Sequence, residues 1–330
     1  MSPGIWMAPL ALLKNSEIYK NKFEWVLKDE KGSPIPCGNI PLWGGDFYTY
    51  DLSIDEARKY VIDEVKKLST KHNYKFLKLD FLYAGLVKGN HKNKEHGTAF
   101  YYYKFQKEMV ESLPADTILL GCGAPLQLSY PFYPIMRIGA DTREEWELLI
   151  GKIAGYEGRP SAYMSLTDTL NRAILNNTVY ISDPDVGFMR NSKIKLTRNE
   201  KLLINIVDYI FGSQFMISDD CDDIDIDLLK ELAVWFEFLK DKKFYCRRFI
   251  KKDIYYAKDE NDLILAFFNL SDKDIIITET DFEKLFTQEN KKNIEKFNLI
   301  QYLKNSIKYI KLDFPFIVEK HNFIFLAKNE

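Results

Sequence analysis

The sequence is poor in cysteine and has no paired cysteine motif. Its four cysteines are Cys37, Cys122, Cys221 and Cys246. They are widely scattered, without a CxxC pair or a dense framework, which argues against a disulfide scaffold and against a zinc ribbon. This usage is typical of a reducing compartment, and we expect the protein to be cytoplasmic.

The chain also lacks an excess of charge of one sign. Lys plus Arg number 46 and Asp plus Glu 48, which gives a formal net charge of -2. No bulk basic field is therefore present to bind nucleic acid or an anionic membrane, and we expect neither as a partner. The opening MSPGIWMAPLALL has no basic segment before its apolar run and is too short for a transmembrane helix. We interpret it as a buried strand.

Histidine is scarce, and no metal-binding pattern is evident. Only four histidines are present; His91 and His96 are five residues apart in a loop rich in Lys and Asn, so we expect solvated loop residues. The acidic segment SDDCDDIDID lacks the ligand spacing and the central glycine of a calcium loop. An acidic turn that precedes a helix starting near Leu228 is the better interpretation.

What the sequence does contain is a repeated alternation of apolar runs and amphipathic segments. In 330 residues, 46% are hydrophobic, enough for a packed core. The alternation continues to about residue 240 and predicts βα units around a parallel sheet. The predicted strands are Gly4–Pro9, Tyr74–Leu82, Thr117–Cys122, Ile135–Ile138, Thr178–Ile181 and Phe215–Ser218. From about Asp253 short alternating segments predict an antiparallel β domain.

These patterns give the expected fold class and domains. We expect an α/β chain with a (β/α)₈ TIM-barrel-type catalytic domain over residues 1–244 and a small antiparallel β-sandwich over 245–330. Six predicted strands are two fewer than a closed barrel needs, so we expect the first two strands to be missing from the N-terminus. Predicted helices begin at Ser53, Thr142 and Thr197, each followed three residues later by Glu in a capping-box pattern.

The segment YKFLKLDFLY carries two charges in what should be a buried strand. Alternation places Lys78 and Asp80 on one face and Leu77 and Leu79 on the other. Burying a charged side chain costs on the order of several kcal/mol unless the charge is paired or serves a function. A functional carboxylate at the C-terminal end of a barrel strand is one interpretation. A structural Lys–Asp pair is the alternative.

A second carboxylate follows the strand ending at Ile138. Asp141 comes after the turn residue Gly139 and just before Thr142. Taken alone, Asp141 is better interpreted as a helix-capping residue than as a catalytic one. Two carboxylates at separate strand ends are, however, what the cleavage of a glycosidic bond requires. Asp80 and Asp141 are therefore the candidate catalytic pair.

Three further residues sit at strand ends. Cys122 and Gly123 would let a ligand approach the backbone closely, although a buried structural thiol beside a turn glycine is the alternative. Trp6, at the end of the first strand, is the aromatic residue that we expect to touch a ligand.

Together these segments resemble the α-galactosidases of glycoside hydrolase family 36, the melibiase-like enzymes of clan D. The similar stretches occur in the family's order: PGIWMAP, EWVL, KLDFLY, LLGCGAP, MRIGADT, SDPDVGFMR, LTRNEKLL and ISDD. The resemblance implies a retaining hydrolase of terminal α-galactosides, with Asp80 as nucleophile and Asp141 as acid/base. It also implies substrate binding by Trp6, Lys78, Cys122, Gly123 and Arg137.

The resemblance implies no metal and no organic cofactor, an α-galactoside oligosaccharide as substrate, and leaves a homo-oligomer open. The sequence departs from the family in several places. The N-terminal β domain, the first two barrel strands and their Asp–Asp–Gly–Trp segment have no counterpart. Ser182 stands where Asn is usual, and Pro134 where Asp is frequent. The alternative hypothesis is a non-catalytic, sugar-binding remnant or an inactive fragment of such an enzyme.

Overall fold

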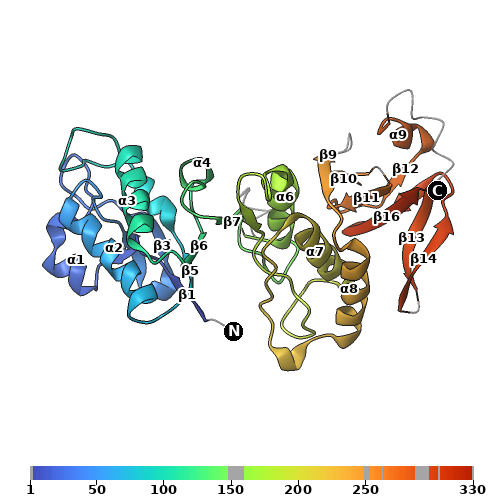
Figure 1. Cartoon of the computed structure of the whole chain (residues 1–330), viewed down its shortest axis with the longest axis horizontal. Coiled ribbons are helices and arrows are strands. Elements are labelled where there is room, and N and C mark those ends of the chain that lie inside the picture. The colour runs from blue at the N-terminus through green and yellow to red at the C-terminus, as the bar shows by residue number, and fades with distance from the viewer. Residues whose placement is uncertain are drawn as a thin grey trace. The chain divides into compact units, whose positions relative to one another are not determined.

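The computed structural model describes residues 3–147, 160–248, 253–261, 263–286, 297–303 and 305–328. The chain divides into two compact units, Met1–Arg137 and Ile138–Glu330 (Figure 1). This division falls within the α/β part of the chain. The boundary at residue 244, which separates α/β from antiparallel structure, stays a prediction.

The first unit is built on parallel strands. They run in the order β1-β5-β6-β7 and are β1 (Gly4–Met7), β5 (Phe76–Leu79), β6 (Ile118–Gly121) and β7 (Ile135–Arg137). The long helices are α2 (Asp55–Thr70) and α3 (Thr98–Ser112), which pack on each other. Between β1 and α2 lies an antiparallel sheet of β2 (Leu12–Leu13), β4 (Gly45–Tyr48) and β3 (Gly38–Ile40), with α1 (Glu17–Asn21). A short helix, α4 (Leu126–Ser129), follows β6.

Apolar periodicity positions α2 as predicted, but the expected cap is absent. Ala57, Val61 and Val65 are buried on one face of the helix. The N-cap is Ile54, with no side-chain cap. The Ser53 hydroxyl instead accepts a hydrogen bond from the backbone N–H of Asn93, at 3.0 Å. A hydrogen bond to a residue forty positions later in the sequence thus takes the place of the expected helix cap at Ser53.

Two expectations about burial in the first unit are wrong. Strand β1 is not buried: Trp6 is 47% exposed, because β1 pairs only with β5 among the described strands of this unit. His91 is not solvated: it is buried, with Nδ1 2.7 Å from Asp51 Oδ1 and Nε2 2.8 Å from Thr98 Oγ1. His96 is exposed, as predicted.

The α/β part of the second unit contains β8 (Ile181–Asp183), α6 (Ala162–Arg172), α7 (Arg198–Phe211) and α8 (Ile226–Leu239). Helix α7 begins with the predicted capping box of Thr197 and Glu200. Helix α8 follows the acidic turn, where Asp225 caps the N–H groups of Asp227 and Leu228.

Three local predictions in the second unit differ from the structure. Residues 141–147 are not helical, and the rest of the helix expected after Thr142 lies outside the described residues. Phe215–Ser218 does not form a strand; Ile217 makes only an isolated bridge to Gly187. The predicted strand Thr178–Ile181 is displaced toward the C-terminus and overlaps β8 only at Ile181.

The rest of the second unit is antiparallel. A six-stranded sheet has the order β14-β13-β16-β11-β10-β9, and a second sheet pairs β12 with β15. The strands are β9 (Phe244–Arg248), β10 (Ile254–Asp259), β11 (Ile264–Asn269), β12 (Ile275–Ile277), β13 (Phe297–Leu303), β14 (Ser306–Lys311), β15 (Phe316–Val318) and β16 (Asn322–Lys328). Helix α9 (Glu279–Glu283) follows β12.

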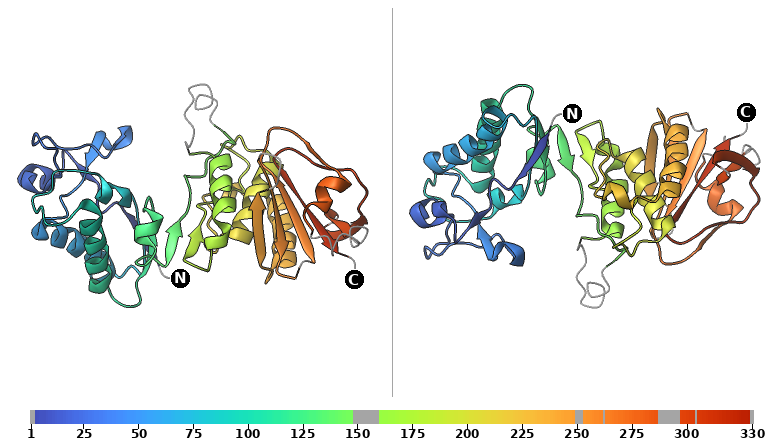
Figure 2. Two further views of the ribbon diagram at one scale, coloured as in Figure 1. Left: turned by 90° about the horizontal axis from the view of Figure 1, so that it is seen from above. Right: turned by 90° about the horizontal axis from the view of Figure 1, so that it is seen from below.

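The central strands of the large antiparallel sheet are buried on both faces. One face packs through Phe268 and Phe325 on α7 and α8, where the Trp235 ring lies 5.3 Å from that of Phe325. The other face packs through Phe267 against Phe282 of α9 and Phe316 of β15. Figure 2 shows the sheet between these two layers. Alternate residues of β11 therefore pack into two different hydrophobic cores, and for this reason every residue of the strand is buried.

None of the helices in the described ranges combines the length and apolar character needed to cross a membrane.

Candidate active site

The carboxyl end of β5 presents Asp80. The alternation predicted for this strand is confirmed: Leu77 and Leu79 are fully buried, whereas Lys78 and Asp80 are only partly buried on the other face. The backbone N–H of Asp80 donates to the carbonyl of Met7 at 2.8 Å, which continues the β1–β5 pairing to the strand end. The carboxylate is thus fixed at the edge where parallel-barrel sites form.

Both carboxylate oxygens of Asp80 accept hydrogen bonds. Trp6 Nε1 donates to Oδ2 at 3.0 Å, and the backbone N–H of Phe81 donates to Oδ1 at 2.7 Å. Hydrogen bonds to both oxygens of a carboxylate fix its orientation. Trp6 thus contacts the candidate nucleophile directly, and its contact with a ligand stays a prediction.

The residue after Asp80 has an unusual backbone. Phe81 lies in the left-handed region, with φ of 54°, which costs a residue with a bulky side chain about 1–3 kcal/mol. Its ring packs on Trp43 and Phe47, at centroid distances of 5.1 and 5.5 Å. The backbone N–H of Tyr83 donates to the carbonyl of Gly123 at 2.8 Å. Aromatic packing and this hydrogen bond hold the strained turn that aims the Asp80 side chain.

Cys122 and Gly123 lie at the end of the neighbouring strand β6. Gly123 has φ of 55°, and a Cβ there would lie 3.4 Å from Asp80 Oδ1 and 3.3 Å from the Phe81 nitrogen. The glycine therefore serves both the turn and the close approach to the carboxylate.

Charged groups surround the Cys122 thiol. Burial, and then the Asp80 carboxylate, raise the pKa of Cys122; Arg137 and Lys78 lower it only in part. The thiol is thus neutral at physiological pH and acts as a small polar group. Arg137 is the last residue of β7 and is buried. The first unit therefore brings together Trp6, Lys78, Asp80, Cys122, Gly123 and Arg137.

Asp141 belongs to the second unit and is exposed, on the non-helical segment 141–147. Thr142, the residue after Asp141, anchors this segment. The Thr142 N–H donates to Asp185 Oδ2 at 2.9 Å, and the Thr142 hydroxyl lies 2.9 Å from the Ser165 hydroxyl. Thr142 thus uses its polar groups to tie the segment to the turn after β8 and to α6, in place of starting a helix.

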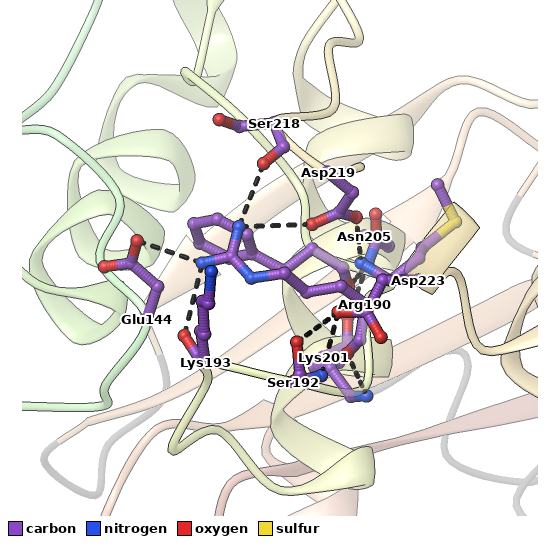
Figure 3. A network of polar contacts seen from close by, with 11 residues as sticks. Glu144, Arg190, Ser192, Lys193, Lys201, Asn205, Ser218, Asp219 and Asp223 are labelled. Atoms are coloured by element: carbon purple, nitrogen blue, oxygen red, sulfur yellow. Dashed lines mark hydrogen bonds and ion pairs between the residues drawn. The ribbon is translucent and has the colours of Figure 1, made fainter. Parts of the chain in front are cut away.

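Arg190 ties the same segment to a second loop (Figure 3). Its guanidinium donates to Glu144 Oε1 at 3.0 Å and to the Ser218 carbonyl at 2.9 Å, and lies 3.5 Å from Asp219 Oδ1. The Asp219 side chain is fully buried and also accepts from the Met189 N–H at 2.5 Å. The Arg190 guanidinium therefore links the segment 141–147 to the loop that precedes α8.

The antiparallel domain reaches the same segment through His321. The His321 ring stacks on Trp146, with centroids 3.9 Å apart and an interplanar angle of 23°. His321 Nδ1 lies 2.6 Å from Glu200 Oε1 in the capping box of α7. Burial opposes ionisation of Glu200, but hydrogen bonds from His321 and Thr197 outweigh it and lower the pKa of this carboxyl.

Sequence reasoning missed two residues beside Asp80, Trp43 and Phe81. The sequence Trp43-Gly44-Gly45 could have indicated Trp43, because two glycines after an aromatic residue leave the backbone beside its ring uncovered by side chains. Nothing in the sequence signals the left-handed Phe81. The separation of the Asp80 and Asp141 carboxylates, which belong to different units, stays a prediction.

In the described part of the chain, no group of three or more His, Cys, Asp or Glu side chains could hold a metal ion.

Known structures share this architecture. No protein-family model matches the sequence. The α-galactosidase of Thermus thermophilus, solved with p-nitrophenyl α-D-galactopyranoside, is 25% identical, with a TM-score of 0.64 over 77% of this chain and 50% of that one. Its complex with stachyose matches at 26% identity and a TM-score of 0.61 over 70% and 48%. The chain thus spans about half the length of that enzyme.

A third structure extends the likeness along the whole chain. The family 27 β-L-arabinopyranosidase of Geobacillus stearothermophilus, solved with arabinose, has a TM-score of 0.61 over 99% of this chain and 74% of that one, at 16% identity. These likenesses confirm the predicted fold class, a TIM-barrel-type α/β domain followed by antiparallel β sheets. The predicted absence of two barrel strands stays a prediction.

Proposed function

We propose that the protein is a retaining glycoside hydrolase that removes terminal α-galactosides from oligosaccharides, as the melibiase-like enzymes of family 36 do. The observation that carries the proposal is Asp80 at the end of β5, hydrogen-bonded by Trp6 and by its own turn, beside Gly123. The likeness to an α-galactosidase solved with two α-galactosides supports this substrate class.

The reaction would be a double displacement. The Asp80 carboxylate attacks the anomeric carbon of galactose while the bond to the leaving oxygen breaks, and Asp141 gives that oxygen its proton. Water then attacks the galactosyl–Asp80 ester, Asp141 takes the proton from the water, and galactose leaves with its configuration retained. This chemistry needs the carboxyl groups of Asp80 and Asp141 about 5 Å apart across one cleft.

The residues around Asp80 would hold the galactose ring. We assign hydroxyl binding to Lys78, Cys122, Gly123 and Arg137, and contact with the sugar face to Trp6. The neutral thiol of Cys122 could donate to a sugar oxygen, and Gly123 would let the ring approach the strand end. No residue in this scheme calls for a metal or an organic cofactor.

Two substitutions test the proposal. Asp80→Asn should abolish hydrolysis of an aryl α-galactoside, because it removes the nucleophile. Asp141→Ala should lose most activity on stachyose but less on an aryl galactoside, whose leaving group needs little protonation. Added azide should restore turnover of the aryl substrate by Asp141→Ala and give α-galactosyl azide, because azide replaces water in the second displacement. Full activity in Asp80→Asn would refute the assignment.

The alternative, a sugar-binding remnant without catalysis, makes a different prediction. It requires a folded wild-type protein that binds galactose measurably and hydrolyses neither substrate.

A further inference from the structure

A pocket of about 350 Å³ lies in the first unit. Its walls are formed by the end of β2, the start of β4 and the 3₁₀ turn Pro41–Trp43. Lining side chains include Lys14, Asn39, Trp43 and Asp46. The volume is within the range of small-ligand sites, on the order of 300–1,000 Å³.

Two glycines leave one wall of the pocket without side chains. Gly44 and Gly45 have φ of 94° and 112°, values that disfavour any other residue. A Cβ on Gly44 would meet nothing within 4 Å, and one on Gly45 would meet only the Asn39 amide at 3.8 Å. Crowding therefore does not require glycine at these positions. The turn requires it, and as a result the backbone is open to a ligand.

The polar groups of the pocket are both donors and acceptors. Asn39 Nδ2 donates to Asp46 Oδ1 at 2.7 Å, which orients the amide and the carboxylate toward each other. That bond uses one amide hydrogen and one carboxylate oxygen, so each group keeps hydrogen-bonding capacity. Lys14 adds an ammonium, 5.2 Å from the Tyr48 ring centroid. One positive and one negative side chain favour an uncharged, hydroxyl-rich ligand over an ion.

Trp43 joins this pocket to Asp80. Its ring lies 6.1 Å from that of Trp6 and 5.1 Å from that of Phe81, measured between centroids. Trp6 in turn donates to the Asp80 carboxylate. Trp43, which lines the pocket, thus packs on Trp6, the residue that hydrogen-bonds to the candidate nucleophile Asp80.

We infer that this pocket binds the leaving-group sugar of an extended neutral oligosaccharide. A sugar ring would stack its C–H face on Trp43, and its hydroxyls would hydrogen-bond to Asn39, Asp46 and Lys14. The inference rests on the proposed function and adds to it a preference for galactose joined to a further sugar over galactose joined to a small leaving group.

The test compares stachyose with α-galactosyl fluoride in each variant. Fluoride occupies no sugar subsite, so its kcat/KM reports the catalytic centre alone. Trp43→Ala should lower the stachyose-to-fluoride ratio of kcat/KM about tenfold, the loss expected for one stacking contact of this kind. Trp43→Phe should keep most of the ratio. Leu42→Ala is the matched control, because Leu42 belongs to the same turn, is 96% exposed and does not line the pocket.

A binding measurement separates failure of this inference from failure of the proposed function. In the Asp80→Asn background, stachyose should bind about tenfold more tightly than galactose, and Trp43→Ala should remove that advantage. If wild-type protein hydrolyses neither substrate but stachyose keeps this advantage, the pocket assignment stands and the proposed activity does not. An unchanged kcat/KM ratio in Trp43→Ala, or equal affinities for the two sugars, would overturn the pocket assignment.

Discussion

The indole N–H of Trp6 lies 3.0 Å from Oδ2 of Asp80, and this hydrogen bond joins the ends of two adjacent parallel strands. The other carboxylate oxygen accepts from the Phe81 N–H at 2.7 Å. A nucleophilic carboxylate must present one oxygen along a defined line to an anomeric carbon. Donors from two separate elements limit rotation of the Asp80 side chain, which favours such a role.

Trp6→Phe should therefore reduce turnover without unfolding the protein. The substitution keeps an aromatic ring and removes the indole N–H donor. Loss of a hydrogen bond to a charged group is worth about 1.5–3 kcal/mol when buried, and Trp6 is half exposed, so we expect a loss in kcat of roughly tenfold. The measurement is steady-state kinetics on an aryl α-galactoside, with the melting temperature as control. An unchanged kcat would show that the Trp6 donor does not orient Asp80.

The cysteines should differ in reactivity. Burial raises the pKa of Cys37 and of Cys246 to about 12, and burial with the Asp80 charge raises that of Cys122. At pH 8 these three are thiols, not thiolates, and should react slowly with iodoacetamide. Cys221 is exposed and should be alkylated first. Peptide mass spectrometry over time, with Cys221→Ser as control, checks the order. Alkylation of Cys122 as fast as Cys221 would contradict this environment.

Glu200 should contribute stability that depends on pH. Burial opposes its charge, but hydrogen bonds from His321 and Thr197 lower its pKa below the ordinary value of 4.5. A lowered carboxyl pKa stabilises the fold above about pH 4.5, and this contribution is lost as the pH falls through the folded-state pKa. Glu200→Gln keeps the capping box and removes the charge, so it should cost about 1 kcal/mol at pH 7.

The pH dependence of this cost is the specific readout. The difference in unfolding free energy between wild type and Glu200→Gln should shrink as the pH is lowered below 4.5. Glu237→Gln, on the exposed face of α8, is the control and should change little at any pH. A difference that stays constant across the range would mean that the Glu200 charge is not involved.

Arg190→Gln should destabilise the second unit. It removes the partner of the Asp219 side chain, which is fully buried, and the donors to Glu144 and to the Ser218 carbonyl. Removing one partner of a buried pair costs about 3–5 kcal/mol, and since Asp219 keeps the Met189 N–H we expect about 2–3 kcal/mol. Denaturant unfolding measures the loss.

The matched control for Arg190 is Arg198→Gln. Arg198 pairs with Glu231 at 2.6 Å, but its side chain is 44% exposed, so the same substitution should cost less than about 1 kcal/mol. Equal losses for the two variants would contradict the network around Arg190.

Local patterns predicted what local forces determine. The alternation in YKFLKLDFLY placed Leu77 and Leu79 inside and Asp80 at the open end of β5, as the structure has them. The Thr197–Glu200 box starts α7 because hydroxyl and carboxylate meet the free N–H groups of one helical turn.

The errors come from contacts distant in sequence. Ser53 and Thr142 have the same capping pattern as Thr197. The Ser53 hydroxyl, however, is hydrogen-bonded to Asn93. The polar groups of Thr142 are hydrogen-bonded to Asp185 and Ser165. His91 is buried because Asp51, forty residues earlier, bonds its ring. No sequence window of helical or strand length contains both partners of these pairs.

As the proposed nucleophile, Asp80 should form a covalent bond to galactose during turnover. The most direct measurement is incubation of the full chain with 2-deoxy-2-fluoro-α-galactosyl fluoride, followed by peptide mapping of the labelled residue by mass spectrometry. We expect one added fluorogalactosyl group, on Asp80, that is lost slowly on addition of an acceptor sugar. A label on another carboxylate would contradict Asp80 as the nucleophile.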